Sequence, residues 1–258
     1  MLNIIRMDLY RMYKTKSFRI CLIIVTLLNL AVGPLEKALF NMVADLSDTE
    51  SLWDNNTVFS EILGAPFGTF DTIAVMLSVV WFTHADIADG YIKNIAGQLP
   101  RKGHTVISKF CALIVHNAMF TLAAIIGQTI GQMIVRKVDF STGIADAAGD
   151  LCIRFLLLMA MSSLVLFFTT AVGARTGGSI IAVLWGGGFL SLAYSGVDML
   201  FSKLLKMDDF QLGDYMPDSN FHESADAFSS GRAFIVAIVF IVALNVLSIN
   251  VFNKKDVK

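Results

Sequence analysis

The sequence has little charge for its length. Only 16% of its 258 residues are Asp, Glu, Lys or Arg, whereas 55% are hydrophobic and the mean hydropathy is +0.67. A soluble domain usually carries about 25% charged residues, so the composition argues against an ordinary soluble globular protein. The hydrophobic residues collect into uncharged runs, and a helix needs about 20 such residues to cross a bilayer. The composition therefore predicts an all-α, polytopic membrane protein.

Signatures of common catalytic and cofactor sites are also missing. The chain has no GxxxxGK[ST] phosphate-binding loop, no HExxH zinc motif, no nucleophile elbow and no kinase signature. Its three cysteines have no paired spacing that would suggest a disulfide or a zinc site. The basic residues are not interleaved with aromatic residues as in nucleic-acid-binding surfaces. We expect no catalytic residue, no metal, no cofactor bound by this chain and no nucleic-acid partner.

The apolar runs predict one transmembrane domain over residues 1–258 with six spans. These lie at about residues 18–39, 66–86, 107–135, 152–173, 177–198 and 232–253. The second span has the shortest uncharged core, and Gly33-Pro34 should bend or end the helix of the first. Residues 1–16 carry an apolar stripe at helical spacing, which predicts a helix lying in the membrane interface, although a solvated helical tail is the alternative.

The charges predict the orientation of these spans. Segments 1–19, 84–109, 174–178 and 253–258 hold 13 of the 20 basic residues but only four of the 21 acidic ones. Lys and Arg in short loops stay on the cytoplasmic side of a membrane. With six spans, both termini are then cytoplasmic.

Polar residues and glycines interrupt several predicted spans. For His116 we favour a neutral, hydrogen-bonded packing role, because no span offers the acidic partner that a proton relay needs. Gln128 and Gln132 either hydrogen-bond a neighbouring helix or face a substrate path, and the first is favoured. Three consecutive glycines, Gly186, Gly187 and Gly188, predict a bend, a close packing contact or a hinge in the fifth span.

The connection after the second span contains a further helical pattern. Residues 86–97 place Ile87, Tyr91, Ile92 and Ile95 on one face before Pro100 ends the helix. A helix of this length does not span a bilayer, so one face lies on the protein and the other is offered to a cytoplasmic partner. An ordinary interfacial loop is the alternative. His84 and Asp89 are five residues apart and point to different helix faces, which argues against a metal site.

The stretch "DIADGYIKNIAGQLPRKGHTVISKF" resembles the loop after the second span in permeases of type-2 ATP-binding cassette (ABC) transporters. In that family an acidic residue and a glycine open a short coupling helix, followed by a proline or serine, a basic residue, and a lysine at the next span. The matching positions are Asp89, Gly90, Pro100, Arg101 and Lys109. The family's usual glutamate is an aspartate in this sequence. The resemblance also covers the amphipathic residues 1–16, the six spans and the "DYMP" before the last span.

The resemblance implies a permease subunit that works with other chains. Two cytoplasmic P-loop ATPase subunits would bind ATP and Mg and hydrolyse the nucleotide, and a second permease copy or a sister permease would complete the dimer. The coupling residues would be Asp86, Asp89, Gly90, Tyr91, Ile92, Lys93, Asn94, Pro100 and Arg101. In the family the first and fifth spans often meet across the dimer, which makes Asn29, Gly33 and Gly186–Gly188 candidates for the dimer seam or the substrate path.

The size and layout resemble small permeases of Gram-positive bacteria that expel amphipathic peptides, namely phenol-soluble modulin exporters and lantibiotic self-protection transporters. We therefore expect an exporter of amphipathic or antimicrobial-type peptides. Two alternatives stay open. One is an ABC permease for drugs, lipids or polymer precursors, and the other is a membrane anchor or sensor that does not transport.

Overall fold

The computed structural model describes residues 2–47, 53–88, 103–173, 175–205, 211–222 and 231–254. Helices dominate these ranges, as the sequence predicts. In chain order the elements are α1 (Leu2–Lys14), α2 (Lys16–Ser47), β1 (Asn56–Val58), α3 (Phe59–Gly64), α4 (Thr69–Ala88), α6 (His104–Val135), β2 (Lys137–Asp139), α7 (Ile144–Val172), α8 (Arg175–Gly186), α9 (Ser191–Leu205), η1 (Leu212–Tyr215), α10 (Pro217–His222) and α11 (Arg232–Lys254).

Four described helices are long and apolar enough to cross a membrane, namely α2, α6, α7 and α11. A fifth candidate is the pair α8 and α9, which is broken and bent by 74°. The helix α4 is apolar over a shorter stretch, Thr69–Ala85. The structure therefore shows a helical protein with four or five apolar helices of membrane-spanning length, and six spans remain a prediction.

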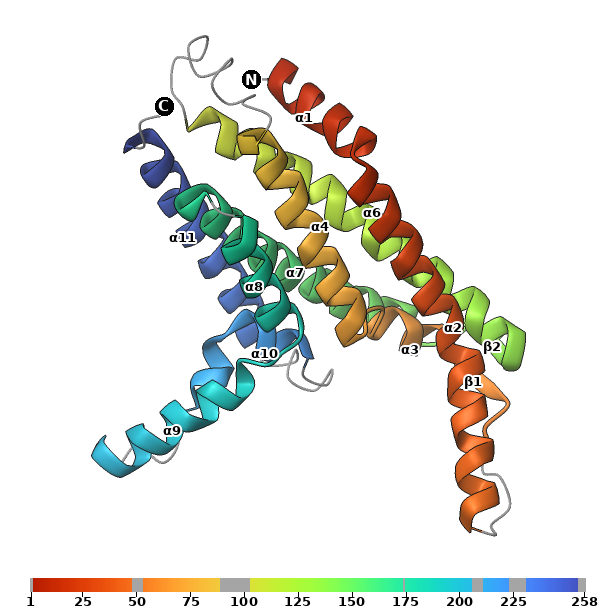
Figure 1. Cartoon of the computed structure of the whole chain (residues 1–258). Helices are drawn as coiled ribbons and strands as arrows, with labels where there is room; N and C mark the ends of the chain where they lie inside the picture. The colour runs from red at the N-terminus through yellow and green to blue at the C-terminus, as the bar shows by residue number, and fades with distance from the viewer. Residues whose placement is uncertain are drawn as a thin grey trace.

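The helices pack as a bundle around a shared apolar core (Figure 1). The most extensive contacts join α2 with α6 and α7 with α11, while α4 lies against α8, α7 and α2. Fully buried side chains at the centre include Phe18, Met76, Leu113, Phe120 and Leu157. The outward faces of α2 and α11 expose rows of Ile, Leu and Val, as expected for helices that face lipid.

One end of the bundle collects the basic segments. Figure 1 shows α1, the end of α4, the starts of α6 and α8 and the end of α11 together at the top. Specific contacts tie them. The backbone N–H of Gly103 donates to Asn253 Oδ1 at 2.8 Å, and the Arg175 guanidinium lies 5.6 Å from the centre of the Trp81 ring. The described parts of these segments therefore lie at one end of the bundle.

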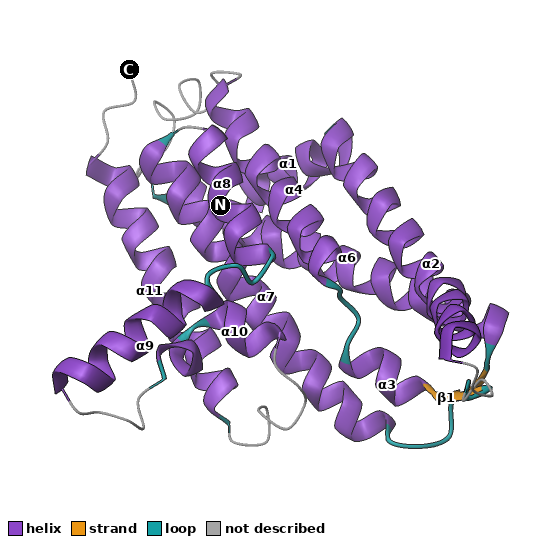
Figure 2. Ribbon diagram, turned by 60° about the horizontal axis from the view of Figure 1, so that its bottom comes forward, coloured by secondary structure: helices purple, strands orange, loops and turns teal. Residues whose placement is uncertain are grey.

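The other end carries shorter elements that the sequence did not predict. The strands β1 and β2 form a two-stranded parallel sheet, with Asn56 opposite Lys137 and Val58 opposite Asp139. Figure 1 shows β1 beside the second half of α2, and both Figure 1 and Figure 2 show α9 projecting sideways from the bundle. The fold is therefore not purely α-helical. The small sheet pairs the connection that follows α2 with the connection that follows α6.

The helix boundaries differ from the predicted spans. Of the two outcomes predicted at Gly33-Pro34, a bend or an end, the structure shows the bend. The helix α2 continues through Pro34 to Ser47, and Figure 1 shows its orange second half running in a different direction from the red first half. A proline interrupts one intrahelical hydrogen bond but does not have to end a helix that neighbouring contacts hold. The helix α7 begins at Ile144, eight residues before the predicted span.

Candidate functional site

The fifth predicted span is broken at its glycines. Gly188 adopts a left-handed conformation (φ 68°), and its N–H donates to Trp185 O at 3.1 Å, while the N–H of Phe189 donates to Leu184 O at 3.0 Å. This is the Schellman pattern that ends helices at glycine. Gly186 also packs closely, because a Cβ there would lie 3.1 Å from Ile73 Cα. The three glycines thus provide both a bend and a close packing contact.

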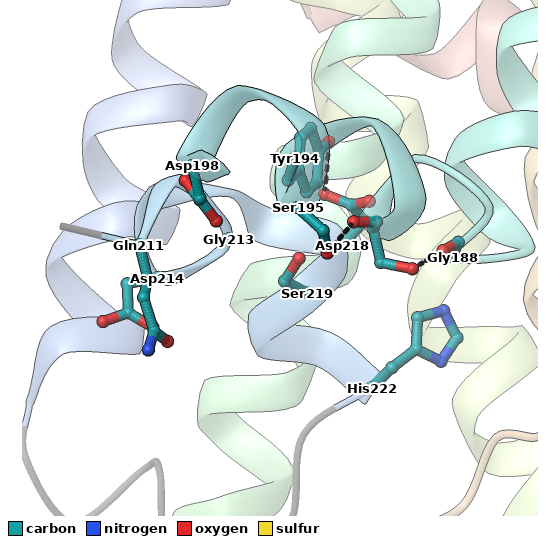
Figure 3. Close-up of a pocket in the computed structure, with 11 residues that line it drawn as sticks. Gly188, Tyr194, Ser195, Asp198, Gln211, Gly213, Asp214, Asp218, Ser219 and His222 are labelled. Atoms are coloured by element: carbon teal, nitrogen blue, oxygen red, sulfur yellow. Dashed lines mark hydrogen bonds between the residues drawn. The ribbon is translucent and has the colours of Figure 1, made fainter. Parts of the chain in front are cut away.

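A polar cleft of about 330 Å³ lies beside this break (Figure 3). Residues of α9, η1 and α10 line it together with Gly188. Its side chains comprise three carboxylates, four hydroxyls, an amide and an imidazole: Asp198, Asp214, Asp218, Ser191, Tyr194, Ser195, Ser219, Gln211 and His222. The cleft is at the end of the bundle opposite the basic segments, where the broken helix turns away from the core.

Each carboxylate of the cleft has a partner that fixes its position. The Tyr194 hydroxyl donates to Asp218 Oδ1 at 3.0 Å, and the N–H of Leu212 donates to Asp198 Oδ1 at 2.7 Å. The Arg232 guanidinium lies 2.8 Å from Asp214 Oδ2. Asp218 is fully buried, and this burial raises the pKa of its carboxyl, with the Tyr194 hydrogen bond acting in the opposite direction.

The cleft offers acceptor groups for cations. Its three carboxylates face a single lining histidine, His222, and Arg232 compensates one of them. In the ranges that the structure describes, no group of three or more His, Cys, Asp or Glu side chains is close enough to hold a metal ion. The arrangement offers acceptors for an ammonium or guanidinium group.

A second polar feature runs through the bundle interior and centres on His116. This residue is fully buried, with Nδ1 3.0 Å from Asn117 Oδ1 and Nε2 3.0 Å from Ser78 Oγ. Because the Asn117 oxygen only accepts, Nδ1 carries a proton, and Nε2 shares a hydrogen bond with the Ser78 hydroxyl. The ring of His116 packs against the rings of Phe18 and Phe120.

The same network reaches two further helices. The Asn117 amide donates to Ser162 Oγ of α7 at 2.8 Å, and Asn245 of α11 donates to Ser163 Oγ at 3.2 Å. Hydrogen bonds between helices are a principal source of helix association where no water competes. Side chains from α4, α6, α7 and α11 therefore hold one another through buried polar contacts.

Gly33, a candidate for the dimer seam, and Gly127 of α6 pack closely within the chain. A Cβ on Gly33 would lie 2.5 Å from Gly131 O, and a Cβ on Gly127 would lie 2.7 Å from Thr26 O. Asn29 is buried beside Gly127 and donates to Val25 O of its own helix at 2.9 Å. These residues bring α2 and α6 together, as Gly186 brings α8 against α4.

The two glutamines lie on the same helix pair. The Gln132 amide donates to Glu36 Oε2 of α2 at 3.1 Å, and the Arg136 guanidinium lies 3.5 Å from the same oxygen. Gln128 is partly buried one turn earlier in α6. Gln132 therefore makes the helix–helix contact that the sequence favoured over a substrate path.

The predicted coupling residues fall largely outside the described residues. This holds for Asp89, Gly90, Tyr91, Ile92, Lys93, Asn94, Pro100 and Arg101, while Asp86 lies in the last turn of α4. The helices on either side of this segment are joined by a hydrogen bond. The Lys109 ammonium is buried and donates to Thr83 O at 3.0 Å, so that the start of α6 is held against the end of α4.

Sequence reasoning missed two charged residues of this structure. Asp8 is buried and accepts a hydrogen bond from Ser108 Oγ, which fastens α1 to α6. Its position within the apolar stripe, between Ile5 and Met12, was a signal that could have found it. Asp218 follows Pro217, a residue favoured in the first turn of a helix, so "MPDS" could have indicated a helix start. Its contact with Tyr194 depends on the break at Gly188.

A protein-family model described as "Protein of unknown function (DUF2705)" matches residues 70–258. The chain belongs to this family. The matched range begins at the second residue of α4 and includes the connection before α6, the broken pair α8–α9 and the polar cleft. Neither the comparison with curated proteins nor that with solved structures finds a match.

Proposed function

We propose that this DUF2705 protein is the transmembrane permease subunit of an ATP-driven ABC exporter in the bacterial cell membrane. The observation that carries the proposal is the position of the two helices that flank the sequence resembling a coupling helix. The end of α4 and the start of α6 lie at the end of the bundle where α1, the start of α8 and the C-terminal end of α11 also lie (Figure 1). That end carries most of the basic residues, which is typical of a cytoplasmic face.

Within this proposal both termini are cytoplasmic and α4 and the α8–α9 pair are the second and fifth of six spans. ATP hydrolysis takes place on two separate P-loop ATPase subunits, which bind ATP and Mg. A second permease completes the complex. Closure of the ATPases pushes on Asp89–Gly97, and the firm contact between Lys109 and Thr83 passes this force to α4 and α6 together.

The proposed cargo is an amphipathic peptide. The polar cleft supports this class, because its partly exposed carboxylates, Asp198 and Asp214, lie at the proposed outer face and attract the cationic side chains common in such peptides. The break at Gly188 places this cleft where one span leaves the bundle, so a change in the angle between α8 and α9 would alter the cleft. Hinges of this kind are used in the opening and closing of binding sites.

The test is co-purification from membranes of the native host. An affinity-tagged chain should bring down a P-loop ATPase, and hydrolysis by the complex should rise with amphipathic peptide. An Asp89→Ala variant should keep the complex but lose the stimulation. A complex that is indifferent to peptides would instead favour drugs, lipids or polymer precursors as cargo. The absence of an ATPase would favour an anchor or sensor.

A further inference from the structure

A basic cleft lies where α1 meets α2, at the end of the bundle opposite the acidic cleft. Its volume is about 500 Å³, and it is lined by Arg6, Leu9, Tyr10, Tyr13, Lys14 and Arg19. No lining residue is acidic, and all but Leu9 are exposed. The buried residues Asp8 and Met12 hold the other face of α1 against the bundle. The cleft is therefore an open, positively charged surface on an anchored helix.

Contacts within the cleft hold its charges in place. The Arg19 guanidinium, at the start of α2, donates to the Lys14 carbonyl at the end of α1 at 3.5 Å. The Lys14 ammonium lies 5.6 Å from the centre of the Tyr10 ring. Three cationic groups thus converge beside two tyrosine rings.

An apolar track continues from the cleft along α2. Ile20, Ile23 and Leu27 follow Arg19 at helical spacing, and each is more than half exposed, at 54%, 58% and 56%. The cleft supplies positive charge, and the track that leads away from it supplies an exposed apolar face on α2. This combination matches a molecule with an anionic head and a long apolar tail.

We propose that the cleft binds the phosphodiester headgroup of an anionic phospholipid, whose acyl chain lies along Ile20, Ile23 and Leu27. Arg and Lys bind phosphate oxygens through charge-assisted hydrogen bonds, and Tyr is enriched at the depth of lipid headgroups. The cytoplasmic leaflet is the one that carries anionic lipids. The inference rests on the membrane orientation proposed above but not on transport, so either can fail alone. An acidic protein surface would match the charges but would leave the apolar track without a role.

The test uses the purified full chain in detergent and native mass spectrometry. Phosphatidylglycerol or phosphatidylcholine is titrated onto the wild type and onto a triple variant with Arg6→Gln, Lys14→Gln and Arg19→Gln. The matched control removes the same charge at the opposite end with Lys37→Gln, Lys137→Gln and Lys203→Gln, all of which are exposed. Thermal unfolding of each variant verifies that the fold is retained.

We expect the cleft variant to bind phosphatidylglycerol at least about tenfold more weakly, because each basic residue adds to the attraction of an anionic lipid. The control should bind like the wild type, and phosphatidylcholine should not distinguish the three proteins. An equal loss of phosphatidylglycerol binding in the control variant would overturn the proposed site. So would displacement of the lipid by inorganic phosphate or by the chain-free glycerophosphoglycerol headgroup at equal potency, since the site would then recognise a free anion. A cleft variant that loses a co-purified ATPase but keeps the lipid would make the surface a protein-docking site.

Discussion

At the residue scale, the described structure depends on polar side chains that the apolar helices bury among themselves. Asn117 is the clearest case, since it holds the His116 ring on one side and Ser162 of α7 on the other. Asp8 and Lys109 are also buried, each with a partner on another helix. A buried polar group is costly unless it is hydrogen-bonded, so each of these residues is specific to one arrangement of the helices.

Replacement of Asn117 by Leu should destabilise the bundle. The change removes the amide that joins α6 to α7 and leaves His116 Nδ1 without its acceptor. Single hydrogen bonds between membrane helices contribute about 0.6 kcal/mol on average and up to about 1.7. We therefore expect a loss of about 1–2 kcal/mol, measured as a lower thermal unfolding midpoint in detergent. The control is Thr129→Val, because the Thr129 hydroxyl bonds only to Ile125 O of its own helix. Equal losses for the two variants would contradict the role of the network.

Replacement of Asp218 by Asn should stabilise the protein at neutral pH. Burial raises the pKa of Asp218 above its ordinary value of 3.8, so the folded state holds the proton more tightly than the unfolded chain does. The wild type consequently loses stability as pH rises from 3.8 through this raised pKa, whereas the asparagine variant has no charge to bury at this position. The gain should vanish toward acidic pH, in thermal unfolding measured across the pH range.

Asp139→Asn is the matched control for Asp218. Hydrogen bonds from the Ser141 hydroxyl and backbone N–H lower the pKa of this exposed carboxyl. Its ionised form therefore favours the folded state above its ordinary pKa, and its removal should not raise stability at neutral pH. A gain of equal size in both variants would show only a general effect of negative charge.

At the element scale, helix contacts made by glycine decide how the bundle is assembled. A Cβ on Gly131 would overlap the carbonyl oxygen of Leu30, so α2 and α6 approach each other as closely as backbones allow at this point. The break between α8 and α9 has the same origin, because Gly186 rests on α4 and Gly188 supplies the left-handed turn. Glycine thus sets both the close contact between α2 and α6 and the bend between α8 and α9.

Alanine substitutions of two glycines should have opposite effects. Gly131→Ala should destabilise by about 1–3 kcal/mol, as overpacking generally does, because α2 and α6 would have to separate. Gly149→Ala, in the exposed first turns of α7, meets nothing within 4 Å and should gain up to about 1 kcal/mol from helix propensity. Thermal unfolding of both variants in detergent measures the difference. Similar effects of the two changes would mean that α2 and α6 are not in close contact.

Much of this element structure could be predicted from the sequence, because runs of apolar residues indicate where membrane helices lie. The glycines at 186–188 indicated an interruption, and the stripe in residues 1–16 indicated α1. The 74° angle between α8 and α9 could not be predicted, because it depends on the packing of Gly186 against the backbone of α4. The β1–β2 pair was missed because strands of three residues leave no periodic pattern. The polar cleft was missed because its residues converge only after the helix has bent.

At the scale of the whole molecule, the chain separates its charges between two ends. Basic residues gather at the end of the bundle that holds α1, the end of α4 and the start of α6, and the acidic cleft lies beside α9 and α10 at the opposite end (Figures 1 and 2). Such asymmetry sets the orientation of membrane proteins. The two clefts would then face different compartments, with the basic one at the inner leaflet and the acidic one outside.

Cysteine labelling in intact cells should confirm this orientation. In a variant without Cys21, Cys111 and Cys152, a single Ser141→Cys change should react with a membrane-impermeant maleimide added outside. Lys14→Cys should react only after the cells are permeabilised. Both positions are exposed, so access to the reagent depends on the side of the membrane. The reverse pattern would place the basic end outside and would remove the basis for an ATPase partner there.

The most direct measurement of the central claim is ATP hydrolysis by the complex purified from native membranes through this chain. The permease account predicts that a P-loop ATPase co-purifies, that amphipathic peptide stimulates hydrolysis, and that Asp89→Ala abolishes the stimulation without loss of assembly. Purified chain that carries no ATPase, or an ATPase whose rate responds neither to peptide nor to Asp89→Ala, would contradict the account.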